Sequence, residues 1–159
     1  MNSDQADILD LLAGHTDDST IERLAFECLM TSLTDDRVAS LMNVLGWRGD
    51  FDCFAIGGTP ETSPASASLV ARKAVRDLGG EHVIVGTYGS FLLALVCQSG
   101  AATAEVTCTS IMPAFKDDES VYLSPVRSGV AGASHVLRET CFPCRRLPLW
   151  RRRPPVACR

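Results

Sequence analysis

Hydrophobic residues recur at helical intervals in the first third of the chain and in alternating or continuous runs beyond it. The helical spacing predicts helices over residues 4–13 and 17–33. A third helix follows the capping residues 34–36 and ends at Gly46, because glycine after a helical stretch is a typical C-terminal signal. The sequence therefore predicts an all-helical N-terminal segment over residues 1–46.

After Gly49 the chain changes to short strand-like runs separated by helices. The predicted strand, helix, strand, strand, helix and strand cover residues 51–56, 66–78, 82–85, 91–97, 103–112 and 121–126. This βαββαβ order predicts an α+β, ferredoxin-like domain, with two helices on one face of a four-stranded antiparallel sheet. A further helix begins at residue 133. We expect the domain to span residues 47–140, with the helical segment packed on it or leading into it.

The composition predicts one soluble domain, and the charge predicts that residues 1–140 do not bind nucleic acid. Of the 159 residues, 46% are hydrophobic and 21% are charged, which is ordinary for a globular protein. The net charge is −4, yet residues 141–159 carry six arginines and no acid, so residues 1–140 carry −10. An acidic body is unlike a DNA-binding surface.

The location of the protein follows from segments that the sequence lacks. No apolar run approaches the ~20 residues of a membrane-spanning helix, and no signal peptide precedes the first helix. We therefore expect a cytoplasmic protein that does not enter membranes. In that compartment Cys28, Cys53, Cys97 and Cys108 are predicted to be small buried hydrophobic residues rather than a disulfide framework.

Three stretches carry a resemblance to a known family: LGWRGDFDCFAIGG (45–58), VIVGTYGSFLLALV (83–96) and VYLSPVRSGVAGASHVLRET (121–140). Together, over about residues 35–140, the chain resembles the central domain of actinobacterial transcription factors of the purine-catabolism-regulator (PucR/CdaR) type. Within that family it is most similar to the regulators of polyketide synthase expression. The resemblance implies a degenerate GGDEF-like fold and a role in transcription regulation.

The GGDEF relationship allows a catalytic role to be tested on the sequence. Diguanylate cyclases carry acidic residues in the hairpin between the second and third strands and an aspartate at the end of the first strand, and these hold the nucleotide and its metal ions. The matching residues here, 86–91 and 57–59, contain no carboxylate. The histidines His15, His82 and His135 are scattered and indicate no metal site. We expect no enzyme activity, no catalytic residue, no metal and no cofactor.

Two places remain as candidates for an effector site or an interface. One is the hairpin tip with Thr87, Tyr88 and Ser90, where Gly86 and Gly89 are expected to supply positive φ. The other is Arg127, before a glycine-bearing segment that is expected to form a tight turn at Gly129 and Gly132. Ordinary solvated turns are the preferred explanation of both places, and a role in binding an effector or a partner is the second interpretation.

The basic tail CFPCRRLPLWRRRPPVACR, residues 141–159, departs from the family pattern where a linker should begin. Its single CxxC, Cys141 and Cys144, lacks the second pair of a structural zinc site. We expect a poorly ordered tail without a site, produced by a frameshift near Thr140 that truncates the regulator before its helix-turn-helix domain. Specific DNA binding by this chain is then not expected.

The sequence thus predicts a non-catalytic sensory or dimerisation domain of a PucR-like regulator. The predicted partner is a second copy of the chain, bound through the helical segment or a sheet edge. Two alternatives remain: a free-standing ferredoxin-like domain that binds a small ligand, and a nucleotide-using enzyme.

Overall fold

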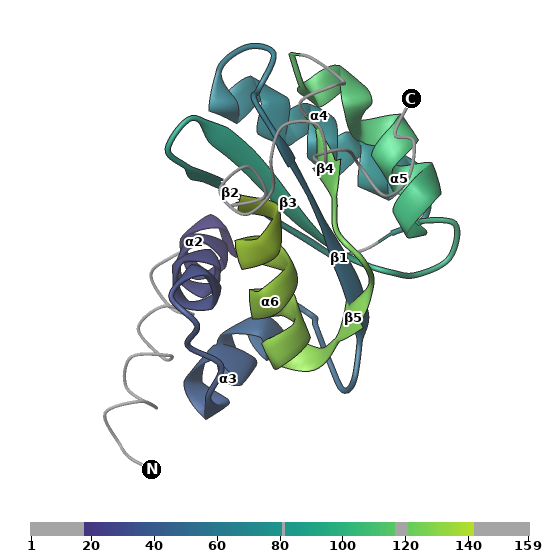
Figure 1. Cartoon of the computed structure of the whole chain (residues 1–159). Coiled ribbons are helices and arrows are strands. Elements are labelled where there is room, and N and C mark those ends of the chain that lie inside the picture. Colours follow the sequence, from purple (N-terminus) through teal and green to yellow (C-terminus); the bar gives the residue numbers. More distant parts are fainter. Residues whose placement is uncertain (1–17, 81, 117–120, 142–159) are drawn as a thin grey trace.

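An antiparallel sheet lies between two layers of helices (Figure 1). The computed structural model describes residues 18–80, 82–116 and 121–141. The strands run in the spatial order β2-β3-β1-β4, and β5 pairs with β1 beside β4. Their bounds are β1 Asp52–Gly58, β2 Val83–Tyr88, β3 Phe91–Cys97, β4 Tyr122–Leu123 and β5 Arg127–Ser128. This order confirms the predicted α+β, ferredoxin-like fold.

The last strand differs from the prediction, because it consists of two short pieces rather than one run over residues 121–126. Between β4 and β5, the Ser124 backbone N–H donates to the Ala55 carbonyl, and the Ala55 N–H donates to Ser124 Oγ at 2.9 Å. A side chain thus takes the place of a backbone acceptor beside β1. Pro125 follows, and proline has no N–H for a sheet ladder.

One face of the sheet is covered by α4 (Pro64–Asp77) and α5 (Ala104–Ile111), as the βαββαβ order predicts. A short 3-10 helix, Met112–Ala114, continues α5. The helices bury Ala67, Ala71, Val75, Cys108 and Ile111 against Phe54, Ile56, Leu92, Ala94 and Val96 of the strands. The helix α4 begins two residues before the predicted start, because Ser63 caps it and a proline is well suited to the first turn.

The opposite face is covered by α2 (Asp18–Met30), α3 (Asp36–Val44) and α6 (Gly129–Cys141), as Figure 1 shows. These helices bury Ala25, Phe26, Leu29, Leu41, Met42, Val136 and Leu137 against Cys53, Ala55, Ile84, Leu93 and Leu95. Because both faces are covered, the central strand β3 is a continuous apolar run, Phe-Leu-Leu-Ala-Leu-Val, instead of an alternating one.

The helical segment and the sheet share one hydrophobic cluster, so α2 and α3 pack on the sheet. The domain boundary at residues 46 and 47 stays a prediction. The predicted helix over residues 4–13 and the tail after Cys141 lie outside the described residues; Cys141 itself is buried at the end of α6. Among the described residues, every helix is too short or too polar to cross a bilayer.

The cysteines are less uniformly buried than the sequence predicted. Cys53 and Cys108 are fully buried, but Cys108 is disulfide-bonded, contrary to the prediction. Cys28 and Cys97 are half-buried at the margin of the cluster formed by α2, α3 and α6. Burial raises the pKa of the Cys53 thiol to about 12, and the neighbouring Cys97 and Asp52 act in the same direction.

Candidate functional site

The predicted hairpin tip is a two-residue turn formed by Gly89 and Ser90. Gly89 has a φ of +60°, as the first position of a type II′ turn requires, and Tyr88 pairs with Phe91 across the turn. Thr87 and Tyr88 therefore belong to β2, not to the connector. Thr87, Tyr88 and Ser90 are all exposed, with Tyr88 at 47%. Thr87 also lines a cavity of about 310 Å³ between α2 and α4.

Gly86 has a different role from the one that the sequence predicted. It does not have a positive φ and lies inside β2. A Cβ atom at this position would come within 2.5–2.6 Å of three ring atoms of Phe26. Gly86 is therefore needed because the Phe26 ring of α2 lies directly on the strand backbone.

Arg127 lies far from the hairpin tip. Arg127 is exposed in β5 and pairs with Cys53, at the start of β1. Thr87 pairs with Leu92 of β3, which in turn pairs with Gly58 at the end of β1. Cys53 and Gly58 are five residues apart along β1, a distance of about 17 Å. The structure therefore does not bring Arg127 together with Thr87, Tyr88 and Ser90 into one site.

The prediction of a tight turn at Gly129 and Gly132 is correct for Gly129 and wrong for Gly132. Gly129 has a φ of +75°, as a turn requires, and it begins α6. Gly132 is buried inside α6, where a Cβ atom would lie 3.0 Å from the Cβ of Arg127. The helix thus starts four residues earlier than predicted, because Gly132 lets it pack closely on β5.

The positions that hold carboxylates in cyclases are occupied by packed glycines. A Cβ atom on Gly57 would lie 2.5 Å from Leu93 and 2.7 Å from Thr140, and one on Gly58 would lie 3.0 Å from Phe115. Side chains from β3, α6 and the segment after α5 thus fill the space at the end of β1. Within the described residues, no group of three or more His, Cys, Asp or Glu side chains could hold a metal ion.

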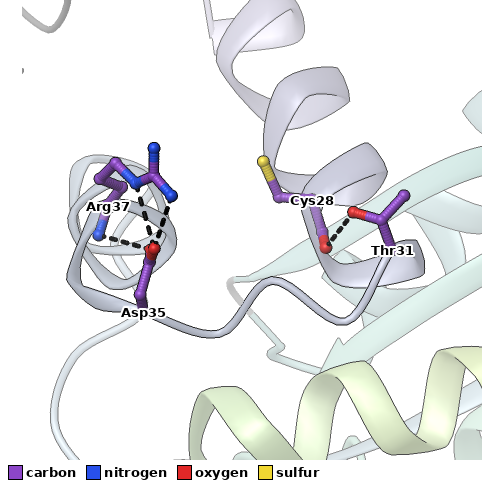
Figure 2. A network of polar contacts seen from close by, with 4 residues as sticks. All are labelled: Cys28, Thr31, Asp35 and Arg37. Atoms are coloured by element: carbon purple, nitrogen blue, oxygen red, sulfur yellow. Dashed lines mark hydrogen bonds and ion pairs between the residues drawn. The ribbon is translucent and has the colours of Figure 1, made fainter.

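Two separate groups of polar contacts lie at the end of α2 and at the start of α3 (Figure 2). Asp35 caps α3: its carboxylate accepts hydrogen bonds from the Arg37 backbone N–H at 3.0 Å and from Arg37 Nη2 at 2.7 Å. These bonds hold the pKa of Asp35 below its ordinary value. Thr31 Oγ1 donates to the Cys28 carbonyl at 3.0 Å, and burial raises the pKa of the Cys28 thiol. Asp35 thus caps α3, as predicted for residues 34–36.

The most distinctive polar group of the described residues is an ion pair at the outer edge of β2. Glu22 of α2 and Arg72 of α4 come from opposite faces of the sheet. Arg72 Nη1 donates to Glu22 Oε1 at 3.0 Å, and Nη2 donates to Oε2 at 2.6 Å. The Val85 backbone N–H also donates to Glu22 Oε2, at 2.7 Å. The pair therefore connects both helical layers to the edge strand.

Sequence reasoning missed this pair, although one signal was present. Glu22 occupies the same helical stripe as Ala25, Phe26 and Leu29, so it is an acid at a core position. A carboxylate at such a position needs a cationic or hydrogen-bonding partner. The partner, Arg72, is 50 residues away in sequence, and only the tertiary structure identifies it.

A cavity of about 450 Å³ lies beside the pair. Its lining combines Glu22, Leu45, Trp47, Arg72, Val75, Arg76, Gly80, His82 and Val83. His82 lies against Gly46, where a Cβ atom would come within 2.5 Å of the imidazole, and its ring centroid is 6.3 Å from that of Trp47. Gly46, which has a φ of +99°, therefore ends the α3 segment and also makes room for His82.

Comparison with known proteins gives a family and a solved relative. Residues 31–141 match the GGDEF-like domain. A crystal structure described as a regulator of polyketide synthase expression from Bifidobacterium adolescentis is 71% identical, with a TM-score of 0.78. The match covers 82% of this chain and 55% of that one, so the chain spans about half the length of this relative. No curated protein matches the chain.

Proposed function

Because the chain belongs to the GGDEF-like domain family, we propose that it is a non-catalytic sensory and dimerisation domain of a PucR-like transcription regulator. The solved relative from Bifidobacterium adolescentis, 71% identical, is described as a regulator of polyketide synthase expression. That protein is longer than the matched region, so regulation of transcription is proposed here for the whole protein to which such a domain belongs.

The observation that carries the non-catalytic role is the packing at the end of β1. A metal-dependent cyclase needs carboxylates there and in the β2-β3 hairpin to hold a triphosphate and its metal ions. Here Gly57 and Gly58 have no space for a side chain, since Leu93, Thr140 and Phe115 fill it. The hairpin offers only a threonine, a tyrosine and a serine.

A domain of this kind acts by binding. In the proposed regulator, an effector or a second copy of the chain favours one of two states and so changes how the DNA-reading part is presented. The proposed homodimer forms through the helical segment or a sheet edge. The apolar faces of α2 and α3 are largely used by the sheet, since Leu41 and Met42 are buried and Leu24 and Cys28 are half-buried.

Two measurements on the purified chain test this proposal. Incubation with GTP and Mg²⁺ should release no pyrophosphate and form no cyclic dinucleotide, while an active diguanylate cyclase serves as the positive control. Sedimentation equilibrium should show a dimer. Turnover of GTP above the buffer background would overturn the non-catalytic role, and a monomer at all concentrations would overturn the dimerisation role. Tight, sequence-specific binding of duplex DNA would show that the chain itself reads DNA.

A further inference from the structure

The cavity beside Glu22 and Arg72 is large enough for a small molecule. Its volume of about 450 Å³ falls within the range of small-ligand sites, roughly 300–1,000 Å³. Four parts of the fold meet around it: α2, the turn after α3, the second half of α4, and the start of β2. A molecule in this cavity would touch both helical layers and the edge strand at once.

The charges around the cavity favour an anion. Arg72 and Arg76 contribute two guanidinium groups, and the carboxylate among the lining residues, Glu22, is already bound to Arg72 and to the Val85 N–H. Within the described residues, Arg76 is exposed and no acidic side chain pairs with it. Among the described residues, Arg76 thus offers an unpaired positive charge at this edge.

Arg72 is held in place and still has donors to offer. Its Nε donates to Ser68 Oγ at 3.2 Å, and its two Nη atoms each donate once to Glu22. A guanidinium has five N–H groups, so two remain, one on each Nη atom. Because three bonds fix the group, binding of an anion there costs little side-chain entropy.

Part of the cavity lining is apolar and aromatic: Leu45, Trp47, Val75 and Val83 belong to it, and Trp47 is only 3% exposed. The Trp47 indole is packed edge-on against Phe51, with ring centroids 4.9 Å apart, and it also neighbours the imidazole of His82. A lining that combines a fixed indole with two arginines suits a ligand with an apolar ring or short chain at one end and an anionic group at the other.

We propose that this cavity is the effector site of the domain, and that the effector is a small organic anion with an apolar ring, carrying a carboxylate or a phosphate. Arg76 and one remaining Nη donor of Arg72 bind the anionic group, and the apolar lining, with Leu45, Val83 and the exposed margin of Trp47, contacts the ring. The inference rests on the proposed sensory function and adds to it the site and the class of ligand.

The experiment uses Trp47 as its reporter. The chain has two tryptophans, Trp47 and Trp150, so Trp150→Phe in the full chain leaves one indole. Phenyl phosphate, benzoate, inorganic phosphate and uncharged benzyl alcohol are titrated, with fluorescence and isothermal calorimetry as readouts. Phenyl phosphate or benzoate should bind saturably, more tightly than benzyl alcohol or inorganic phosphate by at least about fivefold each. The preferred ring-bearing anion distinguishes a phosphate from a carboxylate.

Two variants locate the binding. Arg76→Gln removes a cavity guanidinium and should weaken phenyl phosphate or benzoate binding about tenfold. Lys73→Gln removes one positive charge from the same helix, where Lys73 forms an exposed ion pair with Asp77 and does not line the cavity. It should change affinity less than twofold, which controls for the general charge of α4. Circular dichroism confirms that both variants fold.

The outcomes separate this inference from the proposed function. No saturable binding of either ring-bearing anion at millimolar concentration overturns the effector site. Binding that Arg76→Gln leaves unchanged also overturns it, because the anion then binds elsewhere, while the sensory role survives. Turnover of GTP would instead overturn the non-catalytic role, whatever the titrations show.

Discussion

Replacement of Glu22 by glutamine tests whether the edge ion pair holds the two helical layers together. The Glu22 side chain is 10% exposed, and its oxygens accept three hydrogen bonds, two from Arg72 and one from the Val85 N–H. Glutamine has nearly the same shape but no charge, and only its carbonyl oxygen accepts. At least one bond is lost, and the guanidinium loses its counter-charge.

The expected loss of stability depends on how well water solvates the Arg72 guanidinium once its counter-charge is removed. Removal of one partner from a fully buried ion pair costs about 3–5 kcal/mol. The Arg72 side chain is 29% exposed, so water solvates part of its charge, and the glutamine oxygen retains one or two bonds. With a charge-assisted hydrogen bond at about 1.5–3 kcal/mol, Glu22→Gln should lower the free energy of unfolding by about 2–3 kcal/mol.

Urea unfolding followed by circular dichroism measures this free energy, and a double-mutant cycle with Arg72→Gln isolates the pair. The coupling energy should be about 1–2 kcal/mol, because the two side chains contact each other directly. Hydrogen exchange gives a local readout: the Val85 amide should exchange faster in Glu22→Gln than the global destabilisation accounts for.

The control is the exposed pair of Lys73 and Asp77, whose side chains are 71% and 60% exposed. Lys73→Gln should change the free energy of unfolding by less than about 0.5 kcal/mol. The reasoning is refuted if Glu22→Gln is as mild as this control, or if the coupling with Arg72 is near zero while both variants fold.

Three further predictions follow from contacts and pKa values. Gly86→Ala should lower the free energy of unfolding by about 1–3 kcal/mol in urea, because its methyl group would overlap the Phe26 ring at 2.5 Å; equal stability would contradict this packing. The pKa of Cys53 is raised from 9.0 to about 12, so the stability that its protonated thiol provides is present below pH 9 and is lost as the pH rises towards 12. The unfolding free energy of the wild type should therefore fall more steeply above pH 9 than that of Cys53→Ala, and parallel curves would argue against burial of the thiol. The pKa of Asp35 is lowered from 3.8 by its bonds to Arg37, so its contribution is present above pH 3.8 and is lost on further acidification; the difference in melting temperature between the wild type and Asp35→Asn should narrow there.

The spacing of hydrophobic residues along the chain was enough to predict most of the fold. Helical spacing predicted α2, α3 and α4, and the apolar run of β3 was recognised because it is continuous. The order of elements then gave the ferredoxin-like topology. The errors occurred where tertiary contacts decide the local structure: Ser124 divides the last strand by bonding to Ala55, and α6 begins at Gly129.

The candidate site was less accessible to sequence reasoning. Turn chemistry correctly placed a hairpin at Gly89, yet the residues around it are exposed and Arg127 lies at the other end of the sheet. The pair of Glu22 and Arg72 depends on a contact between residues far apart in sequence. Such a contact is fixed by the packing of α2 and α4 on opposite faces of the sheet, which no local pattern encodes.

The position of the ion pair next to the cavity has a consequence for regulation. A ligand shifts a conformational equilibrium only by the difference between its affinities for the two states. A molecule held by Arg76 of α4 and by Trp47 after α3 contacts elements from both helical layers, so its affinity depends on how those layers are placed. The bonds from Glu22 to Arg72 and Val85 hold α2, α4 and β2 together. If the proposed effector moves α2 relative to α4, breaking these bonds adds to the free energy that it must supply, and a weakened pair would make the same ligand more effective.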